Sequence, residues 1–442
     1  MPDHAMAGGG VMRTVFKLAA LSAWSRRGSL LLLTLSVVAS CSLLLGIDLA
    51  RQSARNTFSN AVSGTDLVVG AQNSPVALLL YSVFRIGEPT RNMPYEVLAQ
   101  LQADPRVKSA LPIALGDSYR GYAVVGTQSA YFSRFQYGVR QSLAFQAGRA
   151  FEDYAVGDPV EHIFEAVLGA DVARKLNHRV GDPIALSHGM QLQTGAPSHA
   201  DKPFKVIGIL QPTGTPVDQS VHISLQGMEA IHLDWQAGMP VRGAEIPAEL
   251  VSKFNLTPQS VTATLVSLHN RAGVFRIQRE LESMPGVALS AILPGVALST
   301  LWQTVGLVEN ILLLVAALVG LVSVLGLISV MLVTLGERRK ELAVLRSTGA
   351  GPWAIFGLVM LESVLVMCLG AFLGILLTAG ASSLLAPWVL SHFGVQLAGV
   401  LGLHQGLLAV LAYTAFGSAL GVVPAWRAYR QQLQDGLSPR GV

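Results

Sequence analysis

Four long apolar runs constrain this chain more than any other feature of its sequence. They cover residues 30–49, 308–335, 354–377 and 400–423. An α-helix needs about 20 predominantly apolar residues to cross a bilayer, so each run is long enough for one span. The sequence therefore predicts a membrane protein with an α-helical transmembrane bundle of four spans.

The composition supports a membrane location and excludes one class of partner. Charged residues make up only 13% of the chain and hydrophobic residues 51%, whereas soluble proteins are about 25% charged. The net charge of +4 is too small for a nucleic-acid-binding surface. We therefore expect contact with membrane lipid and no nucleic-acid partner.

The positions of the basic residues predict how the chain is oriented in the membrane. Segment 378–399, between the third and fourth runs, contains no Lys or Arg, whereas basic residues flank the opposite ends of the runs. They are Arg13, Lys17, Arg26, Arg27, Arg338, Arg339, Lys340, Arg346, Arg427 and Arg430. The positive-inside rule then makes the amphipathic start (1–29), segment 336–353 and the tail (424–442) cytoplasmic. Segment 50–307 would then lie outside the membrane, and 378–399 would be a short outer loop of a multi-pass protein.

Segment 50–307 is long enough for a whole domain, and its patterns predict an α+β fold. Strands are expected at 66–70, 107–125, 164–168, 184–186, 204–210, 221–224, 261–268 and 287–289, and helices at 94–103, 171–176 and 273–283. Helical stalks are expected at 48–60 and 298–308, and loops at 72–92, 187–202 and 236–258. Both cysteines, Cys41 and Cys368, lie in predicted spans, so this domain must be stabilised by packing without disulfides.

Residues 38–41 also look like a lipoprotein cleavage box ending at Cys41, and Arg26 and Arg27 before an apolar run suit a signal sequence. The apolar run continues past Cys41, however, and cleavage there would cut the predicted span. We expect Cys41 to be a buried helix residue.

The segment between the second and third runs carries a dense charged helix. Arg338, Leu342, Leu345 and Gly349 would form one stripe of it. The pattern favours a helix at the membrane face that offers this stripe to a partner, and the alternative is a solvated charge cluster.

The string ERRKELAVLRSTGA (337–350) resembles the cytoplasmic coupling segment of the MacB/FtsX-like ABC transporter permeases, the type VII class. Segments 168–173, 180–184, 204–210, 261–284 and 424–430 resemble other parts of the same family, in the same order. The resemblance implies a separate cytoplasmic ABC ATPase that holds ATP and Mg, and a homodimer of four-span subunits. It implies a bacterial inner-membrane protein with a MacB-like periplasmic domain (50–307) between spans one and two and a short periplasmic loop at 378–399. It also implies a periplasmic or lipoprotein partner. It also implies that the ATPase is coupled through Glu337, Arg338, Arg339, Glu341, Leu342, Leu345, Arg346 and Gly349.

Two functions remain open within that resemblance. One is transport by mechanotransmission, in which an envelope substrate such as a peptide, lipoprotein, antibiotic or metal-linked factor is exported or relocated. The other is FtsX-like regulation, in which the outer domain activates or scaffolds a periplasmic protein. A membrane-anchored sensor is a third reading, but no cytoplasmic signalling domain fits the terminal segments.

No catalytic motif stands out in the sequence. It contains no G-x-x-x-x-G-K-[ST], H-E-x-x-H or G-x-S-x-G pattern. We therefore expect a chain that is not an enzyme and binds no cofactor of its own.

Five residues within the predicted spans are candidates for roles inside the membrane. Glu362 is the one acid of the third span, and we favour a packing role for it over a proton relay. Gly370 with Gly374, and Gly417 with Gly421, form G-x-x-x-G pairs that allow close helix approach, between subunits or within one.

Seven of the ten histidines fall in segment 50–307 and raise the question of a metal site. They are His162, His178, His188, His199, His222, His232 and His269. Their gaps are about ten residues or more, without the closely spaced pairs typical of zinc sites. We therefore expect ordinary surface and core histidines and no metal site.

Overall fold

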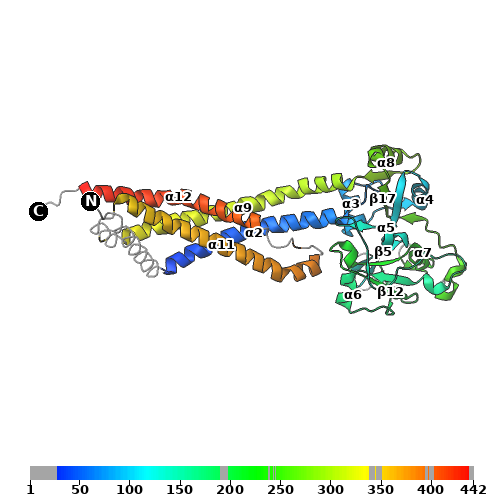
Figure 1. Ribbon diagram of the computed structural model, residues 1–442. Coiled ribbons are helices and arrows are strands. Elements are labelled where there is room, and N and C mark those ends of the chain that lie inside the picture. Colours follow the sequence, from blue (N-terminus) through cyan, green and yellow to red (C-terminus); the bar gives the residue numbers. More distant parts are fainter. Residues whose placement is uncertain are drawn as a thin grey trace, which may run out of the picture. The chain divides into compact units, whose positions relative to one another are not determined.

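The computed structural model describes residues 27–189, 198–236, 239–241, 243, 245–337, 344, 351–393, 397 and 403–437. The chain divides into two compact units (Figure 1). We call them the helical unit (Met1–Gln52, Leu307–Pro387 and Leu397–Val442) and the α+β unit (Ser53–Gly306 and Trp388–Gln396).

Four long helices carry the predicted spans: α2 (Arg27–Ala61), α9 (Pro294–Glu337), α11 (Pro352–Phe393) and α12 (Leu403–Leu437). Among the described residues, three helical segments are long and apolar enough to cross a membrane: Arg27–Ala61, Pro294–Val333 and Pro352–Val389. The fourth predicted span falls largely in α12, which is not among these three, so that span remains a prediction.

The long helices extend beyond the apolar runs. Both expected stalks are helical, as the final part of α2 and the first part of α9. The expected loop at 378–399 is wrong for residues 378–393, because α11 continues to Phe393 with Pro387 inside it. This part of the sequence is rich in Ala and Leu, which lose little side-chain entropy in a helix.

The four helices of the helical unit pack around two apolar clusters. In one cluster, Val37 of α2 and Leu327 of α9 lie with Met367 of α11, and Tyr413 of α12 packs against them. Hydroxyl groups also join α2 to α9, since Ser40 and Ser323 lie 2.7 Å apart between their Oγ atoms. Many leucines on the other faces are exposed, as a lipid-facing surface requires.

The α+β unit contains short strands and helices in the order that the sequence suggested. Its strands are β1 (Leu67–Ala71), β2 (Met93–Pro94), β3 (Val107–Ile113), β4 (Asp117–Tyr119), β5 (Tyr122–Thr127), β6 (Gln136–Tyr137), β7 (Gln141–Ser142), β8 (Phe145–Gly148), β9 (Glu165–Leu168), β10 (Pro183–Ile184), β11 (Ser187–His188), β12 (Phe204–Leu210), β13 (Ser220–Ser224), β14 (Trp235–Gln236), β15 (Met239–Pro240), β16 (Ser260–Val261), β17 (Ala263–Leu268) and β18 (Leu289–Ile292). Its helices are α3 (Pro75–Phe84), α4 (Tyr95–Ala103), α5 (Ala130–Arg134), α6 (Ala170–Leu176), α7 (Leu225–Ala230) and α8 (Val274–Glu282), with 3₁₀ helices η1 (Val160–His162), η2 (Pro216–Gln219), η3 (Ala248–Lys253) and η4 (Arg271–Gly273).

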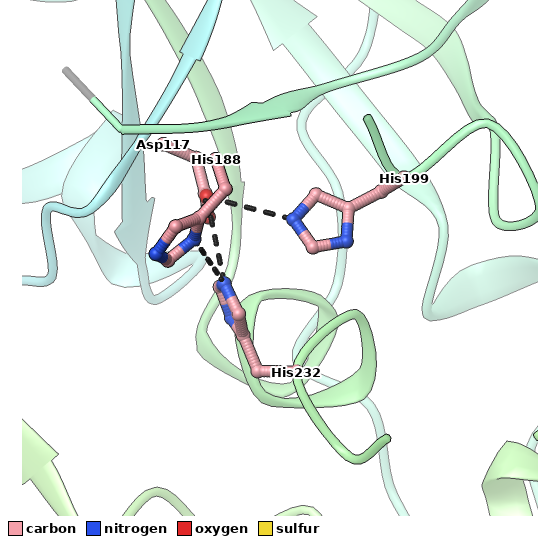
Figure 2. A group of neighbouring side chains, drawn as sticks. All are labelled: Asp117, His188, His199 and His232. Carbon is pink, nitrogen blue, oxygen red and sulfur yellow. Dashed lines mark hydrogen bonds and ion pairs between the residues drawn. The ribbon is translucent and has the colours of Figure 1, made fainter. Parts of the chain in front are cut away.

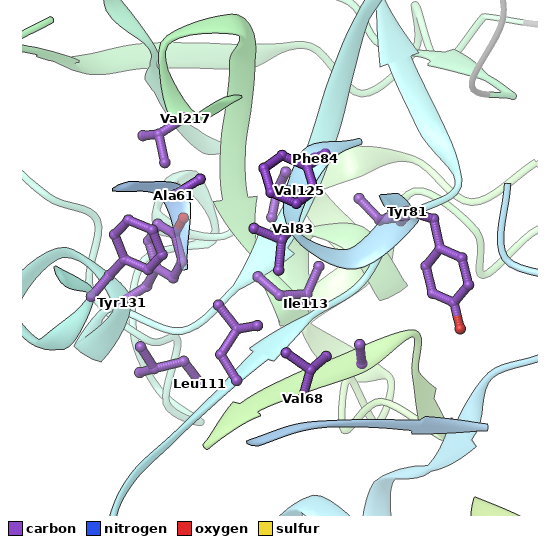
Figure 3. Close-up of a cluster of buried hydrophobic side chains, with 14 of the residues drawn as sticks. Ala61, Val68, Tyr81, Val83, Phe84, Leu111, Ile113, Val125, Tyr131 and Val217 are labelled. Carbon is purple, nitrogen blue, oxygen red and sulfur yellow. The ribbon is translucent and has the colours of Figure 1, made fainter. Parts of the chain in front are cut away.

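The smaller of the two main sheets has the antiparallel order β18-β1-β17-β3 and is buried on both faces. Side chains alternate between the faces of a strand. Leu67 and Val69 of β1 accordingly join a core cluster with Leu98 of α4 and Ile277 of α8. Val68, between them, faces the opposite cluster (Figure 3).

The larger sheet has the order β10-β12-β9-β13-β5-β4-β11, with β8 paired to β12. Val125 of β5 lies in the same cluster as Val68, so one apolar core lies between the two sheets (Figure 3). Val221 and Ile223 of β13 point into a separate cluster on the other face. His222 lies between them in the strand and is fully buried.

Two of the expected loops are in part helical, since 236–258 contains the 3₁₀ helix η3 and 72–92 contains a longer helix. Within 72–92 the structure places α3, whose N-cap Ser74 accepts a hydrogen bond from the Ala77 backbone N–H. Pro75 suits the first turn because its missing N–H would have no helical partner there. The apolar residues that follow, including Leu78 and Leu79, are buried in the core between the sheets.

Candidate functional site

The predicted coupling segment lies mostly outside the described residues. Glu337 is the last residue of α9. The other seven coupling residues are not described: Arg338, Arg339, Glu341, Leu342, Leu345, Arg346 and Gly349. Their role stays a prediction.

The helix ends on either side of this segment are packed together. Leu335 of α9 forms an apolar cluster with Ile355 and Val359 of α11 and with Ala425 and Ala428 of α12. Tight packing makes a cluster of this kind stiff. Helices α9, α11 and α12 therefore meet in one cluster at this end of the helical unit.

Both glycine pairs make contacts within one subunit. A methyl group at Gly370 would lie 2.6 Å from Val37 Cγ1, and one at Gly374 would lie 2.8 Å from Cys41 Cβ. Those contacts join α11 to α2, and Cys41 is fully buried there. These glycines therefore pack within the subunit, which is one of the two arrangements that the sequence left open.

The second pair works in the same way between α12 and α11. A methyl group at Gly417 would lie 2.4 Å from Met367, and one at Gly421 would lie 2.8 Å from Ser363 Oγ. Glu362 is half-buried in α11 beside Ser363 and makes an interaction within the structure. Its expected packing role remains a prediction.

An ion pair joins α2 to α9 near the boundary of the helical unit. Arg51 Nε lies 3.0 Å from Glu309 Oε2, and the Glu309 side chain is only 14% exposed. Because the pair is partly shielded from water, its attraction is stronger than that of a fully exposed pair.

The α+β unit contains a polar cluster that the sequence did not predict. Asp117 and three histidines converge in it, and their ligating atoms all lie within 4.8 Å of one another. His188 of β11 pairs directly with Asp117 of β4 in the sheet register. His199 follows the isolated bridge at Ser198, and His232 follows α7.

The three rings are turned toward one carboxylate oxygen (Figure 2). Asp117 Oδ1 lies 3.1 Å from His188 Nδ1, 3.6 Å from His199 Nε2 and 3.4 Å from His232 Nε2. The Asp117 and His199 side chains are fully buried. Burial by itself raises the pKa of Asp117, but the three facing histidines outweigh it and hold that pKa well below its usual value. The carboxylate is therefore ionised.

The interpretation of the histidines as ordinary residues misses this convergence. Asp117 is 71 positions from His188, and only the pairing of β4 with β11 brings them together. The number of residues between histidines in the sequence cannot reveal ligands that come together only through strand pairing. Of the other histidines, His178 lies 2.9 Å from the Tyr119 hydroxyl and His222 is buried in the core, as expected of structural residues.

Comparison with known proteins defines the class. A model of the MacB-like periplasmic core domain matches residues 29–283, and a model of the FtsX-like permease C-terminal region matches residues 313–433. The chain is thus an ABC transporter permease with a MacB-like periplasmic domain and FtsX-like transmembrane helices. It belongs to the MacB/FtsX-like permease family.

Individual relatives agree with this assignment. The macrolide export ATP-binding/permease protein MacB of Nitrobacter winogradskyi is 26% identical over 312 residues, 65% of this chain and 39% of that protein. The protein of the same name from Nitrosomonas europaea is 27% identical over 272 residues, 60% of this chain and 36% of its own. The chain thus spans less than two-fifths of the length of these relatives.

A solved structure is also similar in part. The periplasmic region of MacB from Actinobacillus actinomycetemcomitans aligns with 57% of this chain and 95% of that region, at 13% identity and a TM-score of 0.31. The family assignment depends on the sequence matches alone.

Proposed function

We propose that this chain is the permease subunit of an ATP-driven transporter that exports or relocates an envelope substrate by mechanotransmission. The observation that carries the proposal is α9, a single helix from Pro294 to Glu337. It begins two residues after β18 and ends at the first residue of the predicted coupling segment. At 1.5 Å per residue it is about 66 Å long.

A continuous helix can transmit force along its axis. In the proposed cycle an ABC ATPase binds segment 337–350, and the movement passes along α9 to the α+β unit. The ion pair between Arg51 and Glu309 supports this proposal, since it ties α2 to α9. The substrate would be moved by the outer domain and need not cross the bilayer.

The remaining parts of the proposal concern partners and location. The ATP and Mg would be held by a separate ATPase, as the resemblance of segment 337–350 to a coupling segment implies. Two permease subunits would pair in the inner membrane, with both termini cytoplasmic, four spans each and a periplasmic or lipoprotein partner outside. An FtsX-like regulatory role, without solute movement, is the alternative that the FtsX-like C-terminal match keeps open.

A pull-down tests the coupling step. The variant Arg338→Glu with Leu345→Asp reverses a charge and places an acid in the predicted stripe, so the ATPase should no longer co-purify with the tagged chain. The matched control is Arg91→Glu with Leu250→Asp, which makes the same changes at exposed positions of the α+β unit. Equal recovery of the ATPase with both variants would contradict the coupling role.

The proteins recovered with the wild-type chain distinguish the two functions. A periplasmic adaptor whose removal stops efflux supports transport, whereas an envelope enzyme whose activity depends on this chain supports regulation. Labelling of residues 336–350 by an impermeant reagent in intact cells would contradict the proposed orientation.

A further inference from the structure

We infer that Asp117, His188, His199 and His232 bind a divalent transition-metal ion, and that zinc is the ion their chemistry suits best. Imidazole nitrogens and a carboxylate oxygen are zinc ligands, and four of them complete a tetrahedral site. The four ligating atoms all lie within 4.8 Å of one another. This site lies in the α+β unit and is independent of the proposed transport cycle.

Four of the six separations between these atoms are close to those of a coordination sphere. Ligands about 2.0–2.1 Å from a tetrahedral ion lie about 3.3–3.4 Å from one another. Here His188 Nδ1 lies 3.1 Å from Asp117 Oδ1 and 3.2 Å from His232 Nε2. His232 Nε2 and His199 Nε2 lie 3.4 Å and 3.6 Å from the same Asp117 oxygen. The two remaining pairs both involve His199 and lie within 4.8 Å, so an ion would need at most a shift of that ring.

The hydrogen bond on the far side of His232 prepares that ring as a ligand. Its Nδ1 lies 2.8 Å from the Met228 carbonyl oxygen. Because a carbonyl can only accept, Nδ1 carries the proton, and Nε2 of the neutral ring presents a lone pair to the cluster. Metal-binding histidines commonly donate their second N–H to a backbone carbonyl in this way.

Several buried atoms of the cluster lack the partners that burial demands. Among the described residues, Asp117 Oδ2 and both ring nitrogens of His199 have no hydrogen-bond partner. A buried polar atom without a partner is costly. In addition, the neutral His232 ring points the lone pair of Nε2 at Asp117 Oδ1, 3.4 Å away. A cation between the two atoms relieves this contact.

The surroundings hold the ligands in place and leave one side open. Lys202 is fully buried and its Nζ lies 2.8 Å from Asp234 Oδ2, so this ion pair joins the segments that carry His199 and His232. Trp235 covers His199, with ring centroids 4.1 Å apart. The side chains of His188 and His232 are 31% and 26% exposed, which gives an ion a route from solvent.

Metal content is the direct test. The full chain, carrying an affinity tag without histidines, is purified in detergent, stripped with EDTA, exposed to Zn²⁺ and passed through gel filtration. Elemental analysis should find a single zinc ion per wild-type chain. Asp117→Asn and His199→Gln should each retain at most about a tenth of that zinc. Even substitutions of residues that only hydrogen-bond to the ligands weaken metal binding by about 10–100-fold. His269→Gln, an exposed histidine of the same unit, should bind as wild type does.

A second measurement needs no variant, in case a ligand substitution prevents folding. Co²⁺ bound to the wild-type chain should give the intense visible absorption of a tetrahedral site, and one equivalent of Zn²⁺ should remove it. Equal zinc in wild type and Asp117→Asn would overturn the inference. So would a Co²⁺ spectrum unchanged from that of the aqueous ion.

Discussion

Gly374 of α11 lies directly against Cys41 of α2: a methyl group on residue 374 would be 2.8 Å from Cys41 Cβ and 3.1 Å from its sulfur. Carbon atoms do not approach so closely without displacement, so the two helix backbones are as near as a glycine permits. The contact explains why this apolar helix carries a glycine despite its cost in helix stability.

Gly374→Ala should therefore destabilise the helical unit, by about 1–3 kcal/mol as for other overpacked sites. Gly380→Ala is the matched control on the same helix, because nothing lies within 4 Å of a methyl group there. It should be neutral or stabilising by up to about 1 kcal/mol. Thermal unfolding in detergent measures both. A Gly374→Ala chain that unfolds normally but changes its oligomeric state would show that this glycine serves contacts between subunits instead.

Lys202→Met should destabilise the α+β unit by about 3–5 kcal/mol, because it leaves the Asp234 carboxylate buried without its cation. Adding Asp234→Asn removes that charge and should restore part of the loss. Lys253 is exposed, so Lys253→Met should stay within about 0.5 kcal/mol of wild type. Unfolding curves of the four chains provide the comparison, and a double variant no more stable than Lys202→Met would contradict the buried-charge explanation.

His222 should make the stability of the α+β unit depend on pH. Burial, and after it the charge of Arg85, lowers the pKa of His222 to about 3. In the unfolded chain the pKa of a histidine is about 6.5. The unfolded chain thus takes up a proton first, and the free energy of unfolding falls as pH drops from about 6.5 toward 3, by up to about 1.4 kcal/mol per pH unit.

His222→Gln removes this contribution and should flatten the dependence of stability on pH in that range. His269→Gln, at an exposed histidine, should keep the wild-type slope. Melting temperatures measured between pH 7 and pH 4.5 test the difference, since the other titrating groups are common to all three chains. Identical slopes for wild type and His222→Gln would refute the assignment.

Arg51 and Glu309 should behave as a coupled pair. Arg51→Glu places two carboxylates face to face and should lower the stability of the helical unit by about 1 kcal/mol, a modest amount because the Arg51 side chain is 35% exposed. Combining it with Glu309→Arg restores opposite charges and should recover most of the loss. A double-mutant cycle in low salt measures the coupling. Additive effects would mean that the pair contributes nothing.

Local patterns in the sequence were sufficient for most of the secondary structure. Strand β12 covers the expected 204–210, and α8 covers most of the expected 273–283. The two stalks also lie in α2 and α9. The spacing of apolar residues and the positions of turn residues depend only on neighbouring positions in the sequence. They can therefore be recognised before the fold is known. Helix α3 was missed because its cap at Ser74 follows a polar segment that suits a loop equally well.

The sequence by itself determined the membrane-spanning character, the α+β unit between the first two spans and the membership of the permease family. All three depend on the apolar runs and short motifs, which lie within continuous segments. The tertiary structure alone decided that the glycine pairs join α11 to α2 and α12 within a subunit. It also decided that Asp117 meets three histidines. Those contacts depend on strand register and helix packing, which bring together residues that no local spacing relates.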